Sequence, residues 1–498
     1  MSGIPLKPSP SEFVEHCRQG NLIPVHTELT ADYETPLSAF RKISDGQHAF
    51  LLESAETRED AGRFSFLGSD PRALFQSRGQ EVTITDENGE RRFISTSDPL
   101  LDLEAFMDRY QPVDFPELPV FHGGAVGYIA YDAVRYVETT VEPPPPDSLG
   151  VPELIFMIAD TAVIFDHRFR RMILVANVCT DDHGSPEAAY AAAGEKIESL
   201  VKKLEAPLHL KPAPAYTESK AVDPVSNTTR EEYCAMVESA KEYIRSGDIF
   251  QVVPSQRFEV PYTGDPVDLY RALRHINPSP YMFCLQFPDG FSLVGSSPEV
   301  HVRAIDGKID IRPIAGTRWR GQSEEEDVAL EKDLLADPKE RAEHIMLVDL
   351  ARNDVGRIAR YETVEVTDLM IIDRYSHVMH IVSNVTGRLH PDKTAYDVMR
   401  ATFPAGTVSG SPKVRAMQII NELEKNKRCA YAGAVGYFGF DGNHDSCIAL
   451  RTVVLKNGKA YVQAGAGVVA DSVPENEYTE TVNKAMGMIR AIEHAKQI

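Results

Sequence analysis

Residues 463–480 read QAGAGVVADSVPENEYTE, a stretch that predicts a strand, a turn of small residues and then a helix. Ala460, Val462 and Ala464 alternate as one face of a strand does. Gly465 and Gly467 follow, and they let a ligand come close to the backbone because neither residue has a Cβ. The stretch therefore predicts amide donors grouped at the end of a strand.

The helix that follows brings acidic side chains next to this turn. Ser472 and Glu475 have capping-box spacing, and Pro474 suits a first helical turn. Glu477 and Glu480 are three residues apart and so share one helical face. Amide donors beside paired carboxylates suit an anion held next to a hard cation. The alternative is an ordinary tight turn before a solvated acidic helix.

The composition excludes several classes of protein. The 498 residues include 52 basic and 74 acidic side chains, and the net charge of −22 argues against nucleic acid or an anionic membrane as the main partner. Six scattered cysteines without metal-ligand spacing indicate reduced thiols. The sequence has no apolar run of about 18 residues that would predict a membrane span, and no signal-peptide core at its start. We therefore expect a soluble cytoplasmic protein.

Many strand and hairpin signals with interspersed helices predict a mixed α/β (α+β) fold whose sheets are largely antiparallel. Asn88-Gly89, Asp306-Gly307 and Asn457-Gly458 predict hairpin turns. The proline-rich residues 205–227 predict a linker between an N-terminal region, 1–204, and a C-terminal domain, 228–498. Expected helices cover 11–18, 100–110, 185–204 and a stretch that begins at 229, and expected strands cover 49–52, 154–164 and 171–178.

Two distant segments echo each other. Residues 123–132, GGAVGYIAYD, match residues 432–441, AGAVGYFGFD, at six of ten positions. One interpretation is a common type of glycine-containing strand, and the other is a duplicated sheet core.

A second pair of carboxylates precedes the first in the chain. Pro338 predicts the start of a helix that carries Glu340 and Glu343 three residues apart. Two helices that each bear Glu-x-x-Glu can bring carboxylates together around Mg²⁺, which takes oxygen ligands and keeps some of its waters. The alternative is that each pattern arises by chance on a solvated helix.

Three further segments are candidates for a binding site. Gly316 and Thr317 follow a strand and offer an amide and a hydroxyl to a carboxylate, unless they only form a strand-ending turn. Residues 403–413, FPAGTVSGSPK, are a glycine-rich loop entering a helix, but Lys413 is not placed as in a phosphate-binding loop. Such a helix N-terminus can still face an anion. His380, in SHVMH at 376–380, is either an acid–base group or a structural histidine.

Taken together, these motifs resemble the large subunits of the anthranilate synthase family, which use chorismate. The resemblance covers nearly the whole chain. It rests on PIAGT at 313–317, DLARND at 349–354, SHVMH at 376–380, the loop at 403–413 and QAGAG at 463–467.

The resemblance implies a role for each matching residue. It implies that Glu343 and Glu480 bind Mg²⁺, with Glu340 and Glu477 nearby. It implies that the substrate is held by Gly316, Thr317, Tyr431, Arg451, Gly465, Ala466 and Gly467. It implies that Glu299 protonates the leaving C4 hydroxyl of chorismate as ammonia adds at C2, that His380 assists the later loss of pyruvate, and that Thr407 belongs to the catalytic set.

Close relatives of this family differ at single positions. Aminodeoxychorismate synthases usually carry a nucleophilic lysine where this chain has Ala315, and isochorismate synthases carry a water-activating lysine where it has Gln251. Both residues favour anthranilate synthase. Aminodeoxychorismate synthase and 2-amino-2-deoxyisochorismate synthase stay as alternatives, as does a non-catalytic tryptophan-binding protein.

The resemblance also implies regulation and a partner. Ser54, Pro280, Tyr281 and Met282 match the tryptophan-inhibition site of the family. Ammonia would come from a separate glutamine amidotransferase subunit in an α2β2 assembly, because the chain has no glutaminase cysteine motif.

Overall fold

The computed structural model describes residues 4–55, 62–208, 223–375 and 378–498. Two large sheets make up most of it, and all neighbouring strands within the described parts of these sheets run antiparallel. The predicted mixed fold with largely antiparallel sheets is confirmed. None of the described helices has the length and apolarity needed to cross a membrane.

The first sheet has eleven strands and contains strands from both halves of the chain. In spatial order they are β1 (Leu22–Thr30), β10 (Arg171–Cys179), β9 (Thr161–Asp166), β3 (Phe64–Ser69), β2 (Ala49–Glu53), β14 (Tyr281–Gln286), β15 (Ser292–Ser297), β24 (Thr452–Lys456), β25 (Lys459–Gly465), β13 (Ser255–Pro261) and β11 (Val225–Ser226).

The second sheet has twelve strands and is shared in the same way. In spatial order they are β18 (Ile314–Trp319), β20 (Val378–Arg388), β17 (Lys308–Ile311), β16 (Val300–Ile305), β23 (His444–Ile448), β22 (Ala434–Gly439), β7 (Gly124–Ile129), β8 (Leu154–Ala159), β4 (Ala73–Arg78), β5 (Glu81–Asp86) and β6 (Gly89–Ile94), while β19 (Glu365–Arg374) also pairs with β20. A separate short pair joins β12 (Gln251–Val252) to β21 (Gly410–Ser411).

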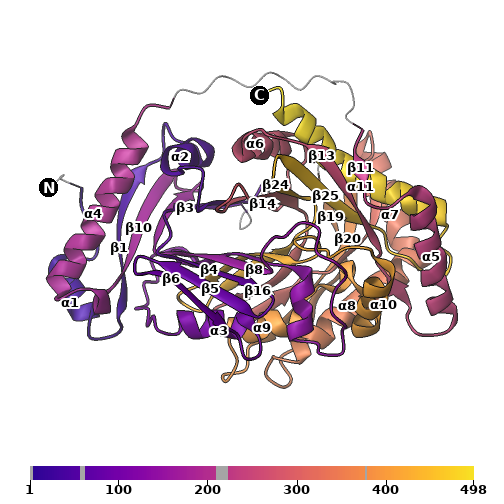
Figure 1. The fold of residues 1–498 in the computed structure, drawn as a ribbon, viewed down its shortest axis with the longest axis horizontal. Coiled ribbons are helices and arrows are strands. Elements are labelled where there is room, and N and C mark those ends of the chain that lie inside the picture. The colour runs from indigo at the N-terminus through magenta and orange to yellow at the C-terminus, as the bar shows by residue number, and fades with distance from the viewer. Residues whose placement is uncertain (1–3, 56–61, 209–222, 376–377) are drawn as a thin grey trace.

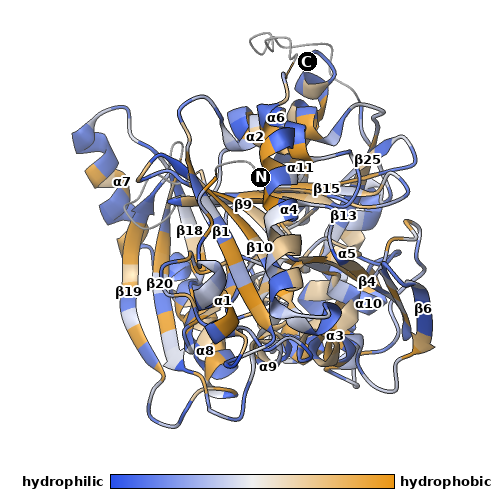
Figure 2. Cartoon of the chain, turned by 90° about the vertical axis from the view of Figure 1, so that its left-hand side faces the viewer, coloured by the Kyte–Doolittle hydropathy of each residue, from blue (hydrophilic) through white to orange (hydrophobic). Residues whose placement is uncertain are grey.

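Helices cover the outer faces of both sheets, and an apolar core fills the space between the sheets. Figure 1 shows α4 beside β1 and β10, with α6 and α11 over the other end of the first sheet. Apolar residues gather in the strands, whereas helices such as α7 carry hydrophilic bands (Figure 2). The helices are α1 (Pro10–His16), α2 (Pro36–Ile43), α3 (Pro99–Met107), α4 (Pro186–Glu205), α5 (Arg230–Arg245), α6 (Pro266–Ile276), α7 (Glu324–Ala336), α8 (Pro338–Gly356), α9 (Ala395–Thr402), α10 (Lys413–Leu423) and α11 (Pro474–Ala495), with short 3₁₀ helices η1 (Tyr131–Tyr136), η2 (Thr180–Asp182) and η3 (Gly406–Val408).

The strand order repeats about the centre of each sheet. Outward from the β2–β14 pair, the first sheet continues through β3, β9, β10 and β1 on one side and through β15, β24, β25 and β13 on the other. The echoing segments form the central pair of the second sheet, β7 and β22, in which Gly127 lies opposite Gly436. A similar contact recurs in both halves, because Gly68 faces the Phe50 ring and Gly295 faces the Phe283 ring. Of the two interpretations of the echo, the topology supports a duplicated sheet core.

One predicted strand proves to be two. The expectation of a single strand over 154–164 is wrong, because the chain leaves the second sheet after β8 and enters the first sheet as β9. Asp160 makes the crossing, and its buried carboxylate accepts a hydrogen bond from Lys196 Nζ at 2.5 Å. Both strands are apolar on both faces because each sheet is covered on both sides, so the sequence shows no break in hydrophobicity there.

The expected hairpins are present. Asp306 and Gly307 join β16 to β17, and Asn457 and Gly458 join β24 to β25, all four with positive φ as type I′ turns require. The hairpin near Asn88 turns one residue earlier than expected, so that Gly89 is already in β6. Of the predicted linker, residues 209–222 lie outside the described residues, and β11 within it pairs with β13. The division into 1–204 and 228–498 stays a prediction, since the two stretches share both sheets.

Candidate active site

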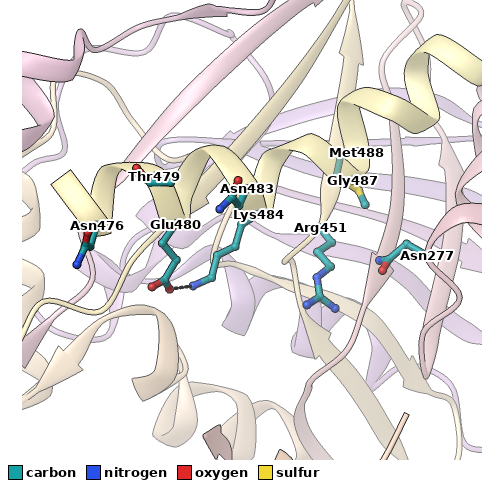
Figure 3. Close-up of a pocket in the computed structure, with 9 residues that line it drawn as sticks. All are labelled: Asn277, Arg451, Asn476, Thr479, Glu480, Asn483, Lys484, Gly487 and Met488. Atoms are coloured by element: carbon teal, nitrogen blue, oxygen red, sulfur yellow. Dashed lines mark ion pairs between the residues drawn. The ribbon is translucent and has the colours of Figure 1, made fainter. Parts of the chain in front are cut away.

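A cavity of about 550 Å³ lies along one face of α11. Glu480 and Lys484 extend from this helix beside Arg451, and Figure 3 marks the ion pair between the first two. Lys484 Nζ lies 2.7 Å from Glu480 Oε1. The cavity thus brings together two of the predicted site residues, Arg451 and Glu480. Its other lining residues are Asn277, Asn476, Thr479, Asn483, Gly487 and Met488.

The sequence of α11 explains how it presents these groups. Its buried side, which includes Ala485, Ile489 and Ile492, belongs to the core on the outer face of the first sheet, so the opposite side faces the cavity. The predicted capping box is wrong: Val473 is the N-cap residue and makes no side-chain cap. Ser472 Oγ instead accepts a hydrogen bond from the backbone N–H of Val469 at 3.0 Å, because Ser472 closes the preceding turn.

The glycine turn at the end of β25 lies at this site. A Cβ on Gly465 would come within 2.7 Å of the Tyr431 hydroxyl oxygen, and a Cβ on Gly467 would come within 2.8 Å of Gln251 Nε2. Between them, the backbone N–H of Ala466 donates to the carbonyl of Pro254 at 3.2 Å. Close neighbours therefore require glycine at 465, where the Pro254 carbonyl is also within 2.9 Å, whereas a Cβ at 467 would only displace the end of the Gln251 side chain.

Arg451 supplies the positive charge of the cavity. It directly precedes β24, with φ of +46°, and its carbonyl accepts the N–H of Ser296 at 3.1 Å. Burial lowers the pKa of the guanidinium, and Glu299 and Tyr375 oppose that shift. Within the described part of the chain no carboxylate lies within ion-pair distance of Arg451. A desolvated cation without a protein counter-ion is suited to an anionic ligand.

Glu299 is a buried carboxyl group between β15 and β16. Burial raises its pKa to about 7, while Thr407, Arg451 and Lys484 each act in the opposite direction. A carboxyl group that is half protonated near neutral pH is matched to general acid catalysis.

His380 is held by the neighbouring strand β18. Its Nδ1 lies 2.9 Å from the carbonyl oxygen of Gly316 and 3.1 Å from Thr317 Oγ1. Because a carbonyl only accepts, Nδ1 carries the proton, and Nε2 keeps its lone pair. Burial lowers the pKa of His380, so the ring is neutral at pH 7. Three predicted residues therefore form one unit that presents a base.

The two Glu-x-x-Glu pairs begin α8 and α11. Burial raises the pKa of Glu340, and Glu343 raises it further. Burial also raises the pKa of Glu477, and the negative charge of Glu480 raises it further. A hydrogen bond with Ser472 and the positive charge of Lys339 in α8 lower it. Like-charge repulsion within both pairs, and the effect of Lys339 across the gap, are consistent with two acidic helix ends that face each other.

The fit of a divalent cation can be tested on these side chains. No group of three or more His, Cys, Asp or Glu in the described ranges has the spacing of a metal cluster. Mg²⁺, however, commonly uses one or two carboxylates and keeps several waters. Glu343 accepts a hydrogen bond from Gln251 Nε2 at 3.0 Å, and Glu480 is paired with the Lys484 ammonium. Both carboxylates already bind donors that a cation can replace, so the donor set fits Mg²⁺.

Lys484 is a site residue that the motifs missed. Its Nζ bridges Glu480 and the carbonyl of Gly465, with 3.0 Å to the latter. The signal in the sequence was the Glu-x-x-x-Lys spacing, which places both side chains on one face of the helix. The same spacing is common on solvated helices, so it does not distinguish the two situations.

The four residues matched to an effector site line a separate cavity of about 670 Å³ between the two sheets. Ser54 follows β2, and Pro280, Tyr281 and Met282 lead into β14, its neighbour. The Tyr281 hydroxyl donates to Asp445 Oδ1 at 2.8 Å and accepts from Arg303 Nε at 2.9 Å. This cavity offers an apolar space with charged groups at its wall.

The comparisons with known proteins agree with this geometry. The chorismate binding enzyme family matches residues 47–490. The chain is 47% identical to anthranilate synthase component 1 of Acetivibrio thermocellus, covering 96% of this chain and 97% of the relative, and 48% identical to that of Pseudomonas putida, covering 98% of each. The crystal structure of anthranilate synthase component I from Streptococcus pneumoniae superposes with a TM-score of 0.76 at 38% identity, covering 93% of this chain and 99% of that one.

The chain belongs to the chorismate-binding enzyme family. All predicted residues of the large cavity and its surroundings, from Glu299 to Glu480, fall inside the matched span. The two residues that favour anthranilate synthase in the sequence also lie in this region. Ala315 precedes Gly316 in β18, and Gln251 bonds Glu343 in place of a free basic group.

Proposed function

We propose that this chain is the large subunit of anthranilate synthase, which converts chorismate and ammonia into anthranilate, pyruvate and water. The observation that carries the proposal is the cavity in which Arg451, without a protein counter-ion among the described residues, lies near the acid Glu299. Chorismate is a dianion, so its carboxylates suit Arg451 and the ammonium of Lys484, which lies at the 465–467 turn.

The first chemical step needs an acid at C4. Glu299 donates its proton to the C4 hydroxyl, which leaves as water, while ammonia forms a bond to C2 and the ring double bonds shift. Ammonia is itself a nucleophile and needs no base to activate it, which suits the neutral Gln251 and the small Ala315. The resulting ammonium group releases one proton to solvent.

The second step needs a base at C2. His380 is neutral, and its Nδ1–H is held by Gly316, so Nε2 takes the C2 proton. The C3–oxygen bond then breaks, the ring becomes aromatic, and the leaving enolpyruvate is protonated to pyruvate, which accounts for the proton that His380 gives up to return to its neutral form. Without this base, the amino intermediate would be released instead, as in 2-amino-2-deoxyisochorismate synthases.

Glu343 and Glu480 would hold Mg²⁺, with Glu340 and Glu477 close by. When bound, the ion would withdraw electron density through the ring carboxylate of chorismate. Gln251 and Lys484 bond Glu343 and Glu480 in the absence of the ion and would give way to it, which would leave the Lys484 ammonium free to face a substrate carboxylate.

Ammonia would be supplied by a glutamine amidotransferase subunit, as the component 1 naming of the relatives suggests. The α2β2 assembly and the cytoplasmic location stay predictions.

The decisive assay follows anthranilate fluorescence with chorismate, ammonium and Mg²⁺, and identifies products by mass. We expect turnover that EDTA abolishes and added Mg²⁺ restores, and a fall of at least about 10²-fold in Glu480→Gln because a metal ligand is lost. Glu475→Gln is the matched control, because Glu475 lies at the solvent-exposed start of the same helix and pairs with Arg230. This control should keep near wild-type activity.

The products also separate the alternatives. Aminodeoxychorismate or the amino intermediate, with no anthranilate, would contradict the proposal and identify the corresponding synthase. Tight binding of tryptophan without any turnover of chorismate and ammonia would favour the non-catalytic alternative.

Tryptophan is proposed to inhibit by binding the cavity lined by Ser54, Pro280, Tyr281 and Met282. Met282→Ala removes apolar contact from this cavity, so we expect the tryptophan Kd, measured by calorimetry, to rise about tenfold or more. The KM for chorismate should not change. Met157→Ala removes the same side chain from a buried strand position that does not line the cavity, and it should leave the Kd unchanged. Wild-type protein without affinity for tryptophan would refute this proposal.

A further inference from the structure

A second, much smaller cavity lies beside Glu299. Its volume of about 30 Å³ is enough for one or two water molecules. It shares no lining residue with the large cavity that contains Arg451. Glu299 therefore borders a small space that is distinct from the proposed substrate cavity.

The wall of this space contains a buried hydroxyl group with spare hydrogen-bonding capacity. Thr407 Oγ1 makes no hydrogen bond of regular geometry to any described residue, but it lies close enough to the Glu299 carboxyl to hydrogen-bond it and so lower its pKa, and its two lone pairs stay open to water. Buried polar groups in native proteins almost always have a partner, and ordered water is the usual one where protein atoms do not supply it.

Other polar groups line the same space. His301 is neutral because burial lowers its pKa to about 3, and its Nε2 lies 3.4 Å from Thr402 Oγ1. Asp354 is paired with Lys413, with 2.7 Å between Oδ2 and Nζ. Apolar side chains such as Leu347 and Ile448 make up most of the wall, and these polar groups, with Glu299 and Thr407, supply the hydrogen-bond partners that water needs there.

The small cavity lies next to the 670 Å³ cavity between the sheets. Val300 and Arg312 line both. Arg312 is partly exposed and its guanidinium pairs with Asp373. Movement of these residues would let water in the small cavity exchange with water in the 670 Å³ cavity, which is not the proposed substrate cavity.

We propose that the small cavity holds water that returns a proton to Glu299 from the side opposite the substrate. After Glu299 gives its proton to the leaving hydroxyl, the carboxylate takes one from this water, which recovers it from solvent. The proton that the new ammonium group releases to solvent balances the cycle. Arg451, Lys484, His301, the Asp354–Lys413 pair and the Arg312–Asp373 pair are the charged or titratable groups around this route. The proposal rests on the acid role of Glu299 in the proposed function.

The test fills the cavity without touching the acid. Ala351 lines the small cavity from α8, so Ala351→Val occupies the water position. Val348→Ile is the matched control, because it adds one methylene to the buried side of the same helix outside the cavity. Infrared spectroscopy follows the exchange of the Glu299 carboxylic proton in D₂O near pD 6, and Glu299→Gln assigns the band. The stable analogue 3-[(1-carboxyvinyl)oxy]benzoate blocks the substrate cavity.

With the analogue bound, we expect exchange in the wild type and in Val348→Ile, and exchange at least about tenfold slower in Ala351→Val. In turnover, Ala351→Val should lower kcat and enlarge the solvent isotope effect while the KM for chorismate stays the same. Thr407→Val, which removes the hydroxyl group at nearly constant shape, should also slow the exchange of the Glu299 proton. This variant replaces Ala351→Val as the test if Ala351→Val does not fold.

Two results would overturn the proposal: exchange that stops in the wild type once the analogue binds, or equal exchange in Ala351→Val and the wild type. Failure of the proposed function looks different. It would appear as no anthranilate and no binding of the analogue, and the exchange rates of the variants would then be compared with the large cavity open, where equal rates would also overturn the relay.

Discussion

Glu299→Gln is expected to lower kcat by about 10³-fold at pH 7, because an amide cannot donate a proton to the leaving hydroxyl and general acid catalysis contributes about 10²–10⁴-fold. The substitution keeps the size of the side chain and removes a carboxyl group that is costly to bury, so the fold should be at least as stable. The KM for chorismate should change little.

The pH profile provides the sharper check. Glu299 must be protonated, and its pKa is raised to about 7, so wild-type kcat/KM should fall as the pH rises through 7. His380 must be neutral, and its pKa is lowered below 6.5, so the acid side of the profile should fall only below that value. In Glu299→Gln the alkaline fall near pH 7 should disappear from the residual activity. If Glu299→Gln still shows the fall in activity near pH 7, or keeps more than a tenth of the wild-type kcat, Glu299 is not the general acid.

Arg451→Gln is expected to raise the KM for chorismate by about 10²-fold or more, since removing one partner of a buried charge pair costs about 2–5 kcal/mol. The free protein should lose little stability, because Arg451 makes no ion pair within the described structure and burial already lowers its pKa. Steady-state kinetics with saturating ammonium measure the effect.

Two other arginine variants serve as controls for this prediction. Arg451→Lys keeps the charge but not the planar guanidinium group. Its KM for chorismate should lie between that of the wild type and that of Arg451→Gln. Arg352→Gln, on the exposed side of α8, should behave as the wild type. An unchanged KM in Arg451→Gln would mean that the carboxylates of chorismate bind elsewhere.

The sequence predicted local features where short-range chemistry decides them. Asp306-Gly307 and Asn457-Gly458 gave the correct turns because both positions need positive φ. The prediction of one strand over 154–164 was wrong, because burial on both faces hides the point at which the chain passes from one sheet to the other. Ser472 was misassigned as a cap because the same hydroxyl can close the turn before the helix.

The site was harder to predict, because its parts are far apart in the chain. Glu299, His380 and Glu480 come from three separate segments, and only the family resemblance joined them before the fold was known. Lys484 escaped notice because its function depends on the carbonyl of Gly465, which no helical pattern reveals. The Thr407 cavity has no signal in the sequence, since it is formed by side chains from several separate elements.

The mirrored strand order makes the chain comparable to a symmetric homodimer whose two subunits have become one polypeptide. In such a pair each half would carry its own copy of the reaction centre. In the first half, the sequence Gly68-Ser69-Asp70-Pro71 corresponds to Gly295-Ser296-Ser297-Pro298, which puts Arg72 at the position of Glu299. Arg72 is tied to Asp182 and cannot donate a proton at neutral pH. Each polypeptide should therefore turn over a single substrate molecule at a time, and the first half is left free to diverge as a scaffold.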